Sequence, residues 1–165
     1  MAHSSAPDSA ILSVALLAGS DVVFTGRQLG EQLFVGRQAV GGAQAWTSSE
    51  CSGALGHAVV VDGRDDIVVV GVSHDGPDGD VRLCKFSPAG ALRWSQTVDG
   101  TFGDDVGHSL AIVAGEQILV AGEHDLGGGQ TDGWLAMFAP ESQSERDMLE
   151  EHVPESGARA PALSE

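Results

Sequence analysis

Short apolar runs alternate with polar, glycine-containing breaks along most of this chain. A block of fourteen residues with this pattern occurs three times without gaps, and its copies begin 45 and 51 residues apart. The copies are SVALLAGSDVVFTG (13–26), AVVVDGRDDIVVVG (58–71) and SLAIVAGEQILVAG (109–122). In each copy two apolar runs flank a turn-forming break, a pattern that predicts a β-hairpin. We therefore expect three units built around the same pair of strands.

A second pair of strands follows the hairpin in the first two units. In unit two, residues 80–94 contain an apolar-rich run, a Ser-Pro-Ala-Gly turn and a second run that ends at Trp94. Trp46 stands 48 residues earlier and marks the same strand in unit one. Unit three supplies its third strand at 132–138, but the chain beyond it is polar and charged, so its fourth strand is absent. Trp46, Trp94 and Trp134 are expected to be packing residues.

The apolar positions within the hairpins are consecutive rather than alternate, which favours a sheet covered on both faces. Radially packed four-stranded blades have this property, because each blade lies between two neighbours. A parallel β-solenoid would need shorter coils, and a plain β-sandwich would not repeat its sequence at this period. We therefore predict an all-β, β-propeller-like fold of about three four-stranded antiparallel blades, the last one incomplete. It is not a closed ring on its own, since known propellers typically have about four to eight blades.

The repeats also define the expected domain organisation. The β-propeller repeat domain covers residues 9–140, with units at about 9–52, 53–101 and 102–140. Residues 1–8 are expected to be a disordered N-terminus. Residues 141–165 are an acidic tail that is expected to be disordered or, through a capping box near its start, to form a short helix.

Longer stretches of these units resemble known bacterial repeats. The segment GHAVVVDGRDDIVVVGVSHDGPDGDVRLCKFSPAGALRW (56–94) resembles the bacterial surface-protein β-propeller repeat family. The segments EQILVAG (116–122) and DGWLAMF (132–138) are also similar to the delta-60 type of bacterial repeat. The resemblance spans about residues 9–140 and implies a propeller from a protein that is extracellular or attached to the cell envelope. Because such proteins usually carry many more copies, we expect a fragment of a larger surface protein, or a chain that completes a ring with copies of itself.

Charge and length narrow the classes of partner. The chain has 165 residues, 42% of them hydrophobic, which suffices for one folded unit with a core. Its 24 acidic residues against 8 basic ones give a formal net charge of −16, which would repel nucleic acid and anionic lipid surfaces. No stretch has the roughly 18–20 apolar residues of a membrane span. The start MAHSSAPDSA lacks a basic residue before the apolar run 11–18, so we expect no signal peptide and leave the localisation open.

The two cysteines define neither a disulfide framework nor a zinc site. Cys84 falls within an apolar strand pattern, where a free buried thiol is the ordinary interpretation. A disulfide between Cys51 and Cys84 is the less favoured alternative, and the redox compartment stays open.

Histidines recur at the period of the repeat. His57 and His108 occupy equivalent places in units two and three, and His74 and His124 follow the second strand of each. This recurrence favours roles at turns and strand edges. We expect equivalent histidines in neighbouring blades to be held too far apart to share a metal ion.

The candidate metal ligands lie in the acidic loop HDGPDGD at 74–80. Asp75, Asp78 and Asp80 offer hard carboxylate oxygens, which are the donors that calcium prefers. The spacing is not that of an EF-hand, and Asp and Gly are also the ordinary residues of tight turns. We therefore keep these three as a calcium candidate, with turn formation as the favoured role, and expect no other cofactor.

No motif in the chain indicates catalysis. There is no Gly-x-Ser-x-Gly elbow, and the glycine run 127–129 lacks the Lys-Ser/Thr of a phosphate-binding loop. We therefore predict a non-catalytic repeat module that binds or scaffolds a protein or glycan partner, by analogy of fold. Exposed blade faces would also allow self-association. The alternative is a fragment of a propeller-type enzyme, a hydrolase or dehydrogenase, whose site lies in missing blades.

Overall fold

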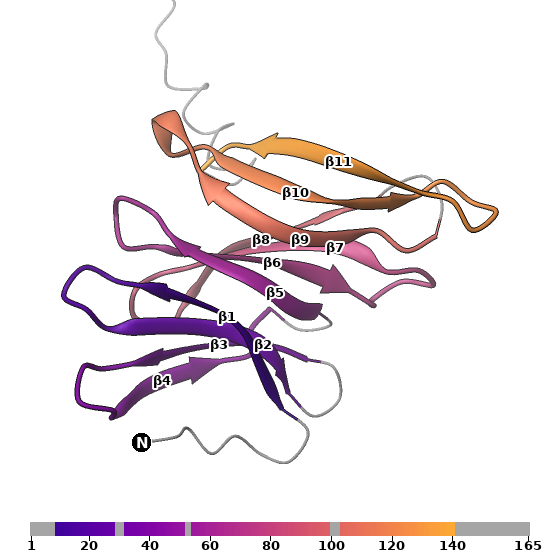
Figure 1. Ribbon diagram of the computed structural model, residues 1–165. Helices are drawn as coiled ribbons and strands as arrows, with labels where there is room; N and C mark the ends of the chain where they lie inside the picture. The colour runs from indigo at the N-terminus through magenta and orange to yellow at the C-terminus, as the bar shows by residue number, and fades with distance from the viewer. Residues whose placement is uncertain (1–8, 29–31, 52–53, 100–102, 141–165) are drawn as a thin grey trace, which may run out of the picture.

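The computed structural model describes residues 9–28, 32–51, 54–99 and 103–140, so the expected N-terminal and C-terminal tails lie outside the described residues. These residues form three antiparallel sheets of four, four and three strands, which stack face to face without closing into a ring (Figure 1). The predicted all-β, blade-like fold with an incomplete last unit is confirmed. The described part of the chain contains no helix with the length and apolarity that a bilayer crossing requires.

Each sheet is a meander in which neighbours along the chain are neighbours in the sheet. Blade 1 contains β1 (Ala10–Leu16), β2 (Val22–Gln28), β3 (Gln32–Gln38) and β4 (Gln44–Ser48). Blade 2 contains β5 (Ala54–Val61), β6 (Ile67–Ser73), β7 (Asp80–Phe86) and β8 (Leu92–Val98). Blade 3 contains β9 (Val106–Ile112), β10 (Ile118–Asp125) and β11 (Thr131–Phe138), with the short 3₁₀ helix η1 (Ala114–Glu116) between β9 and β10.

The same turn closes the first hairpin of every blade. The N–H groups of Leu17, Asp62 and Val113 each donate a hydrogen bond of 2.9 Å to the carbonyl oxygen four residues later. Near the end of each turn a residue other than glycine has a positive φ, namely Ser20, Asp65 and Glu116. These positions are 45 and 51 residues apart, as in the sequence repeat, so the predicted hairpins and their equivalence are confirmed.

Two hydrophobic cores hold the three blades together. Ile67 and Val69 of β6 belong to the core between blades 1 and 2, whereas Val68 and Val70 belong to the core between blades 2 and 3. All four side chains are 0% exposed. The consecutive apolar residues therefore cover both faces of the middle blade, as the sequence predicts.

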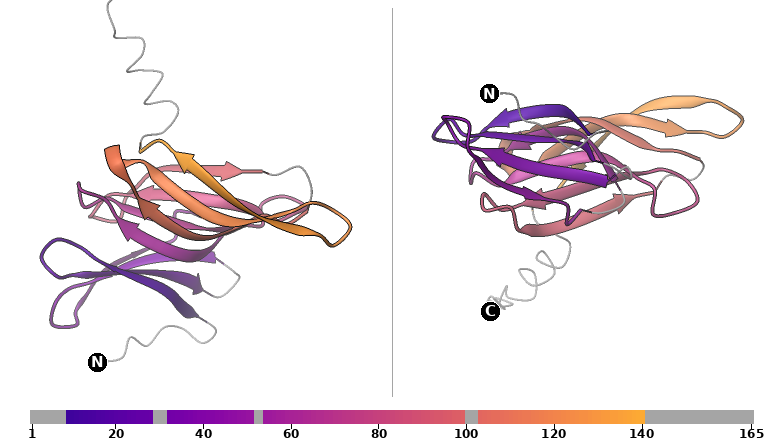
Figure 2. Two further views of the ribbon diagram at one scale, coloured as in Figure 1. Left: turned by 45° about the horizontal axis from the view of Figure 1, so that its top comes forward. Right: turned by 90° about the horizontal axis from the view of Figure 1, so that it is seen from below.

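The blades stack by one repeated contact. The first strand of blade 2, β5, packs across β1, β2 and β3 of blade 1, and β9 packs in the same way across β5, β6 and β7 of blade 2 (Figure 2). Blade 2 therefore uses one face to pack on blade 1 and the other face to receive blade 3.

The expectation of a free thiol at Cys84 is wrong. Cys51, which follows β4 of blade 1, forms a disulfide with Cys84 on β7 of blade 2, and the two Cα atoms are 6.5 Å apart. Both cysteines are 0% exposed and lie in the core between the first two blades. The sequence pattern placed Cys84 correctly in a buried strand, but blade stacking brings Cys51 against it, which no local pattern reveals.

The tryptophans are packing residues, as expected. Trp94 belongs to the core between blades 2 and 3, and the side chain of Trp134 packs against the same core. Trp46 of blade 1 donates a hydrogen bond of 3.1 Å from Nε1 to the carbonyl oxygen of Pro88 in the β7–β8 turn of blade 2. The recurring tryptophans thus strengthen the contacts between blades.

Candidate functional site

Near the loop between β6 and β7, the structure brings together a different set of acidic residues from the set that the sequence predicted. Asp75 and Asp78 are exposed on this loop, whereas Asp80 is partly buried at the start of β7. Among the described residues, one group of three carboxylates has an oxygen from each member within 4.8 Å of the others: Asp80, Asp99 and Asp105. We call this group the acidic cluster. Of the residues predicted from the sequence, only Asp80 belongs to it.

Strand pairing and blade stacking assemble the acidic cluster. β7 and β8 are antiparallel, and Val81 lies opposite Val98. Asp80, at the start of β7, therefore lies beside Asp99, which follows the end of β8. Asp105 immediately precedes β9, the first strand of blade 3. The acidic cluster therefore lies at the junction of blade 2 and blade 3.

Asp105 is the best anchored and most buried member of the acidic cluster. Its N–H donates to the carbonyl oxygen of Gly79 at 2.5 Å, and its Oδ1 accepts from the N–H of Asp125 at 3.1 Å. The same Oδ1 lies 2.8 Å from His124 Nδ1. Asp105 is 0% exposed, and its Oδ2 is buried with no hydrogen-bond partner in the described part of the chain. One oxygen of a rigidly held carboxylate is thus uncommitted.

The charges around Asp80 are unfavourable to its ionised form. Partial burial raises the pKa of the Asp80 carboxyl, and the negative charges of Asp99, Asp105, Asp78 and Asp104 raise it further. Within the described ranges, no lysine or arginine forms an ion pair with any member of the acidic cluster. In the described part of the chain the acidic cluster therefore contacts no lysine or arginine, and its contact with a basic side chain is that of Asp105 Oδ1 with His124.

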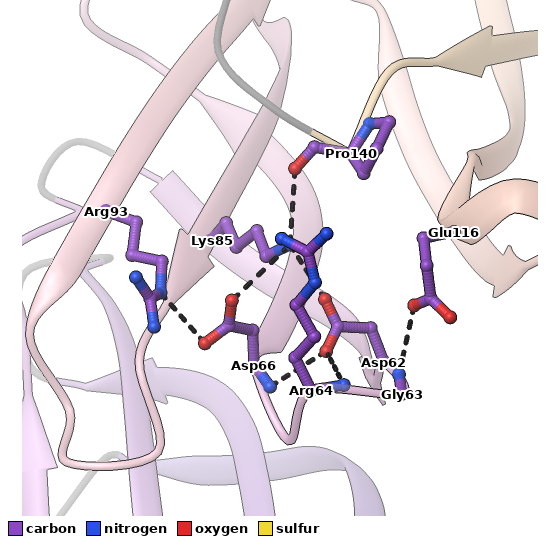
Figure 3. Close-up of polar contacts among 8 residues, drawn as sticks. All are labelled: Asp62, Gly63, Arg64, Asp66, Lys85, Arg93, Glu116 and Pro140. Carbon is purple, nitrogen blue, oxygen red and sulfur yellow. Dashed lines mark hydrogen bonds and ion pairs between the residues drawn. The ribbon is translucent and has the colours of Figure 1, made fainter. Parts of the chain in front are cut away.

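A second group of charges lies at the other end of β7, where the sequence predicted no site. Lys85 is 3% exposed, and its Nζ lies 2.7 Å from Asp62 Oδ2 and 3.5 Å from Asp66 Oδ2 (Figure 3). Nζ also donates to the carbonyl oxygen of Pro140 at 3.2 Å, and Arg93 Nε donates to Asp66 Oδ1 at 2.8 Å. We call Asp62, Asp66, Lys85 and Arg93 the Lys85 network.

The Lys85 network is internally satisfied. Asp62 Oδ1 accepts hydrogen bonds of 2.9 Å from the N–H groups of Arg64 and Asp66 and so fixes the β5–β6 turn. Burial alone would raise the pKa of Asp62, but the hydrogen bonds from Lys85 and from the two N–H groups outweigh burial and lower it. This group stabilises the turn and leaves no carboxylate without a partner, so its role is structural.

The histidines correct one expectation. His57 of blade 2 and His108 of blade 3 are equivalent in the repeat, yet their rings stack with centroids 5.7 Å apart, so neighbouring blades do not hold them apart. His57 Nδ1 is 3.0 Å from the carbonyl oxygen of Gly107, and His108 Nε2 is 3.2 Å from Glu123 Oε1. Burial lowers the pKa of His57, and its hydrogen bond to Gly107 offsets this only in part. The pair links β5 to β9 at the strand edges.

Apolar side chains are exposed on the two outer faces of the stack. On β1, Leu12, Val14 and Leu16 are 51%, 64% and 69% exposed; we call this the leading face. On β11, Leu135 and Met137 are 71% and 57% exposed; we call this the trailing face. Exposed apolar groups of this kind are a common mark of contact with another protein.

Comparison with known proteins supports the fold and gives no activity. No family model and no curated protein matches the chain. Among solved structures, the chain is similar to a protein of unknown function from Bacteroides caccae, with a TM-score of 0.53 and 10% sequence identity. The match covers 78% of this chain and 47% of that protein. This chain thus spans about half the length of its structural neighbour.

Proposed function

We propose that this chain is a non-catalytic, protein-binding module whose exposed leading face binds the trailing face of a second copy. The support comes from the equivalence of positions across the repeat. Val14 on the leading face is equivalent to Val59 of blade 2 and Leu110 of blade 3. Val59 and Leu110 pack on the preceding blade and are 4% and 8% exposed, whereas Val14 is 64% exposed. The leading face is therefore a packing face without a blade in front of it among the described residues.

The trailing face gives the complementary argument. Leu135 is equivalent to Leu83 of blade 2 and Val35 of blade 1. Leu83 and Val35 lie in the cores where the following blade packs, and both are 0% exposed, whereas Leu135 is 71% exposed. This contrast is the single observation that carries the proposal.

The two outer faces complement each other rather than themselves. Within the chain, a face of the leading type always packs on a face of the trailing type. Association between copies in the same manner is head to tail, which closes into a ring or extends into an open assembly. The large negative charge of the chain opposes association at low salt, so physiological ionic strength favours it.

The location outside the cytoplasm that the repeat resemblance implies is part of this proposal. The disulfide between Cys51 and Cys84 supports it, because disulfides persist mainly in oxidising compartments. A protein-binding repeat module of a cell envelope is the function that best accommodates both observations.

The test is the solution mass by light scattering at about 0.15 M salt. Val14→Asp disables the leading face and Leu135→Asp disables the trailing face. Val40→Asp is the matched control, because Val40 is 67% exposed but lies in the turn between β3 and β4. We expect the wild type and the control to assemble, and each single variant to be monomeric.

Mixing the two variants sharpens the test. Each retains one intact face, so an equimolar mixture should form a one-to-one complex that neither variant forms alone. A wild type that stays monomeric at high concentration, or single variants that assemble like the wild type, would show that these faces do not bind a second copy.

A further inference from the structure

The acidic cluster is independent of the two outer faces. Its three carboxylates come from three segments: Asp80 from the start of β7, Asp99 from the end of β8 and Asp105 from the entry to β9. Repulsion among carboxylates at this spacing opposes their convergence, and a bound cation relieves it. We propose that Asp80, Asp99 and Asp105 bind a calcium ion at the junction of blades 2 and 3.

The uncommitted oxygen of Asp105 is the second, independent observation. Its side chain is 1% exposed. Oδ1 accepts a hydrogen bond from the N–H of Asp125 and lies 2.8 Å from His124 Nδ1, while Oδ2 is buried without a hydrogen-bond partner in the described residues. A buried carboxylate oxygen without a partner is costly, and coordination to a cation satisfies it. Turn formation does not account for it, because the turn contacts of this segment use the backbone and Oδ1.

The donor set favours calcium over magnesium, because calcium accepts irregular oxygen coordination whereas magnesium demands near-ideal octahedral geometry. Calcium binds oxygens at about 2.3–2.6 Å, so two ligands on opposite sides of the ion are about 4.6–5.2 Å apart. For magnesium, with bonds of about 2.0–2.1 Å, that separation is only about 4.0–4.2 Å. The donor oxygens of the acidic cluster all lie within 4.8 Å of one another, so one calcium ion can contact all three.

The donor set indicates modest affinity. Three carboxylates leave several of calcium's six to eight coordination positions for water, and Asp99 is exposed. We therefore expect a dissociation constant in the range of about 10⁻⁴–10⁻³ M, as in extracellular calcium modules. The ion would neutralise part of the negative charge where blade 3 meets blade 2.

Calorimetric titration of the chelator-treated full chain with calcium chloride tests the site, together with thermal unfolding with and without calcium. Asp99→Asn is the main variant, because this exposed residue accepts an amide of the same shape without disturbing the core. Asp75→Asn is the matched control, since Asp75 is exposed on the neighbouring loop but outside the acidic cluster.

We expect calcium to raise the midpoint of the wild type and the control by roughly 2–4 °C, and magnesium to raise it less. Asp99→Asn should weaken binding at least tenfold and abolish the calcium-dependent rise. The same variant should melt above the wild type in the absence of calcium, because it removes repulsion from Asp80.

Three results would overturn the proposal. The first is a wild type that shows neither binding heat nor a midpoint shift at about 10 mM calcium, well above the expected dissociation constant. The second is an Asp99→Asn variant that binds like the wild type. The third is an equal loss of response in Asp75→Asn, which would indicate general screening of surface charge. Asp80→Asn provides a second variant should Asp99→Asn fail to fold.

Discussion

Carboxylates cluster at both ends of β7, but the two clusters differ in whether a basic side chain of the protein is buried among them. At one end, Lys85 is buried against Asp62 and Asp66 with nitrogen–oxygen distances of 2.7 and 3.5 Å. At the other end, Asp80 meets Asp99 and Asp105, and no lysine or arginine of the described residues pairs with them. Grouped acidic residues therefore do not by themselves indicate a ligand. The Lys85 network contains its own cation, whereas the acidic cluster, for which we propose a calcium ion, contains no lysine or arginine.

The first test of this comparison removes the charge of Lys85, the cation that the chain itself provides. Lys85→Met should destabilise the protein by about 3–5 kcal/mol, because Asp62 and Asp66 would keep buried charges without their common partner. Denaturant unfolding measures the change.

Arg93→Met is the matched control for that variant. The side chain of Arg93 is 49% exposed while it binds Asp66, so its removal should cost less than about 1 kcal/mol. Equal effects of the two substitutions would contradict the interpretation of Lys85 as the central charge.

The second way is to make the same chemical change at both ends of β7. In calcium-free buffer, Asp62→Asn should lower the free energy of unfolding by about 1–3 kcal/mol, because Asp62 bonds to Lys85 and to two N–H groups. Asp80→Asn should raise it by up to about 1 kcal/mol, because it removes a carboxylate that its neighbours repel. Changes of the same sign would show that the two groups are electrostatically alike.

The third and smallest effect is the dependence of stability on pH without calcium. Because the pKa of Asp80 is raised, its stabilising contribution to the free energy of unfolding is present below pH 3.8, its ordinary pKa. This contribution is lost as the pH rises through the raised pKa. Because the pKa of Asp62 is lowered, its stabilising contribution to the free energy of unfolding is present above pH 3.8 and is lost as the pH falls through the lowered pKa.

Unfolding curves of the wild type and of each Asp→Asn variant between about pH 3 and 7 separate the two contributions. The difference for Asp80→Asn should grow above pH 3.8, and that for Asp62→Asn should shrink below it. A difference for Asp80→Asn that does not change with pH would contradict this account.

The sequence predicts the parts of this fold that repeat locally. Ile67 to Val70 form one uninterrupted apolar run, and this run alone implies a sheet covered on both faces. The fourteen-residue blocks predict the hairpins, because each contains its own turn. The sequence after Phe138 loses its apolar pattern, in agreement with the three strands that blade 3 has in the described residues.

The acidic cluster is only partly predictable. Asp80 is found through the acidic loop, but Asp99 and Asp105 stand 19 and 25 residues further along the chain and meet it only through strand pairing and blade stacking. Asp75 and Asp78 share the loop composition and lie outside the cluster, because the loop directs them to solvent. Composition therefore identifies the region but not its ligands.

Part of the Lys85 network can be predicted by comparing the repeat units, although composition does not indicate it. Asp66 and Lys85 are equivalent to Asp21 and Arg37, which stand 45 and 48 residues earlier and form an ion pair of 2.6 Å. An acid–base pair that recurs at the repeat period predicts a structural contact. In unit three the same positions are Gln117 and Met137, so the pair is lost where no further blade follows in the described chain.

The bond between Cys51 and Cys84 sets the order in which the molecule yields to a mechanical load. Blades 1 and 2 cannot be drawn apart without breaking a covalent bond, because the disulfide bridges them through their common core. In the described part of the chain, blade 3 is tied to blade 2 by the main chain and by noncovalent contacts. When the molecule is stretched from its ends, tension therefore passes from Cys51 to Cys84 through the disulfide, and β5 and β6, which lie between them, are not extended until the disulfide is reduced.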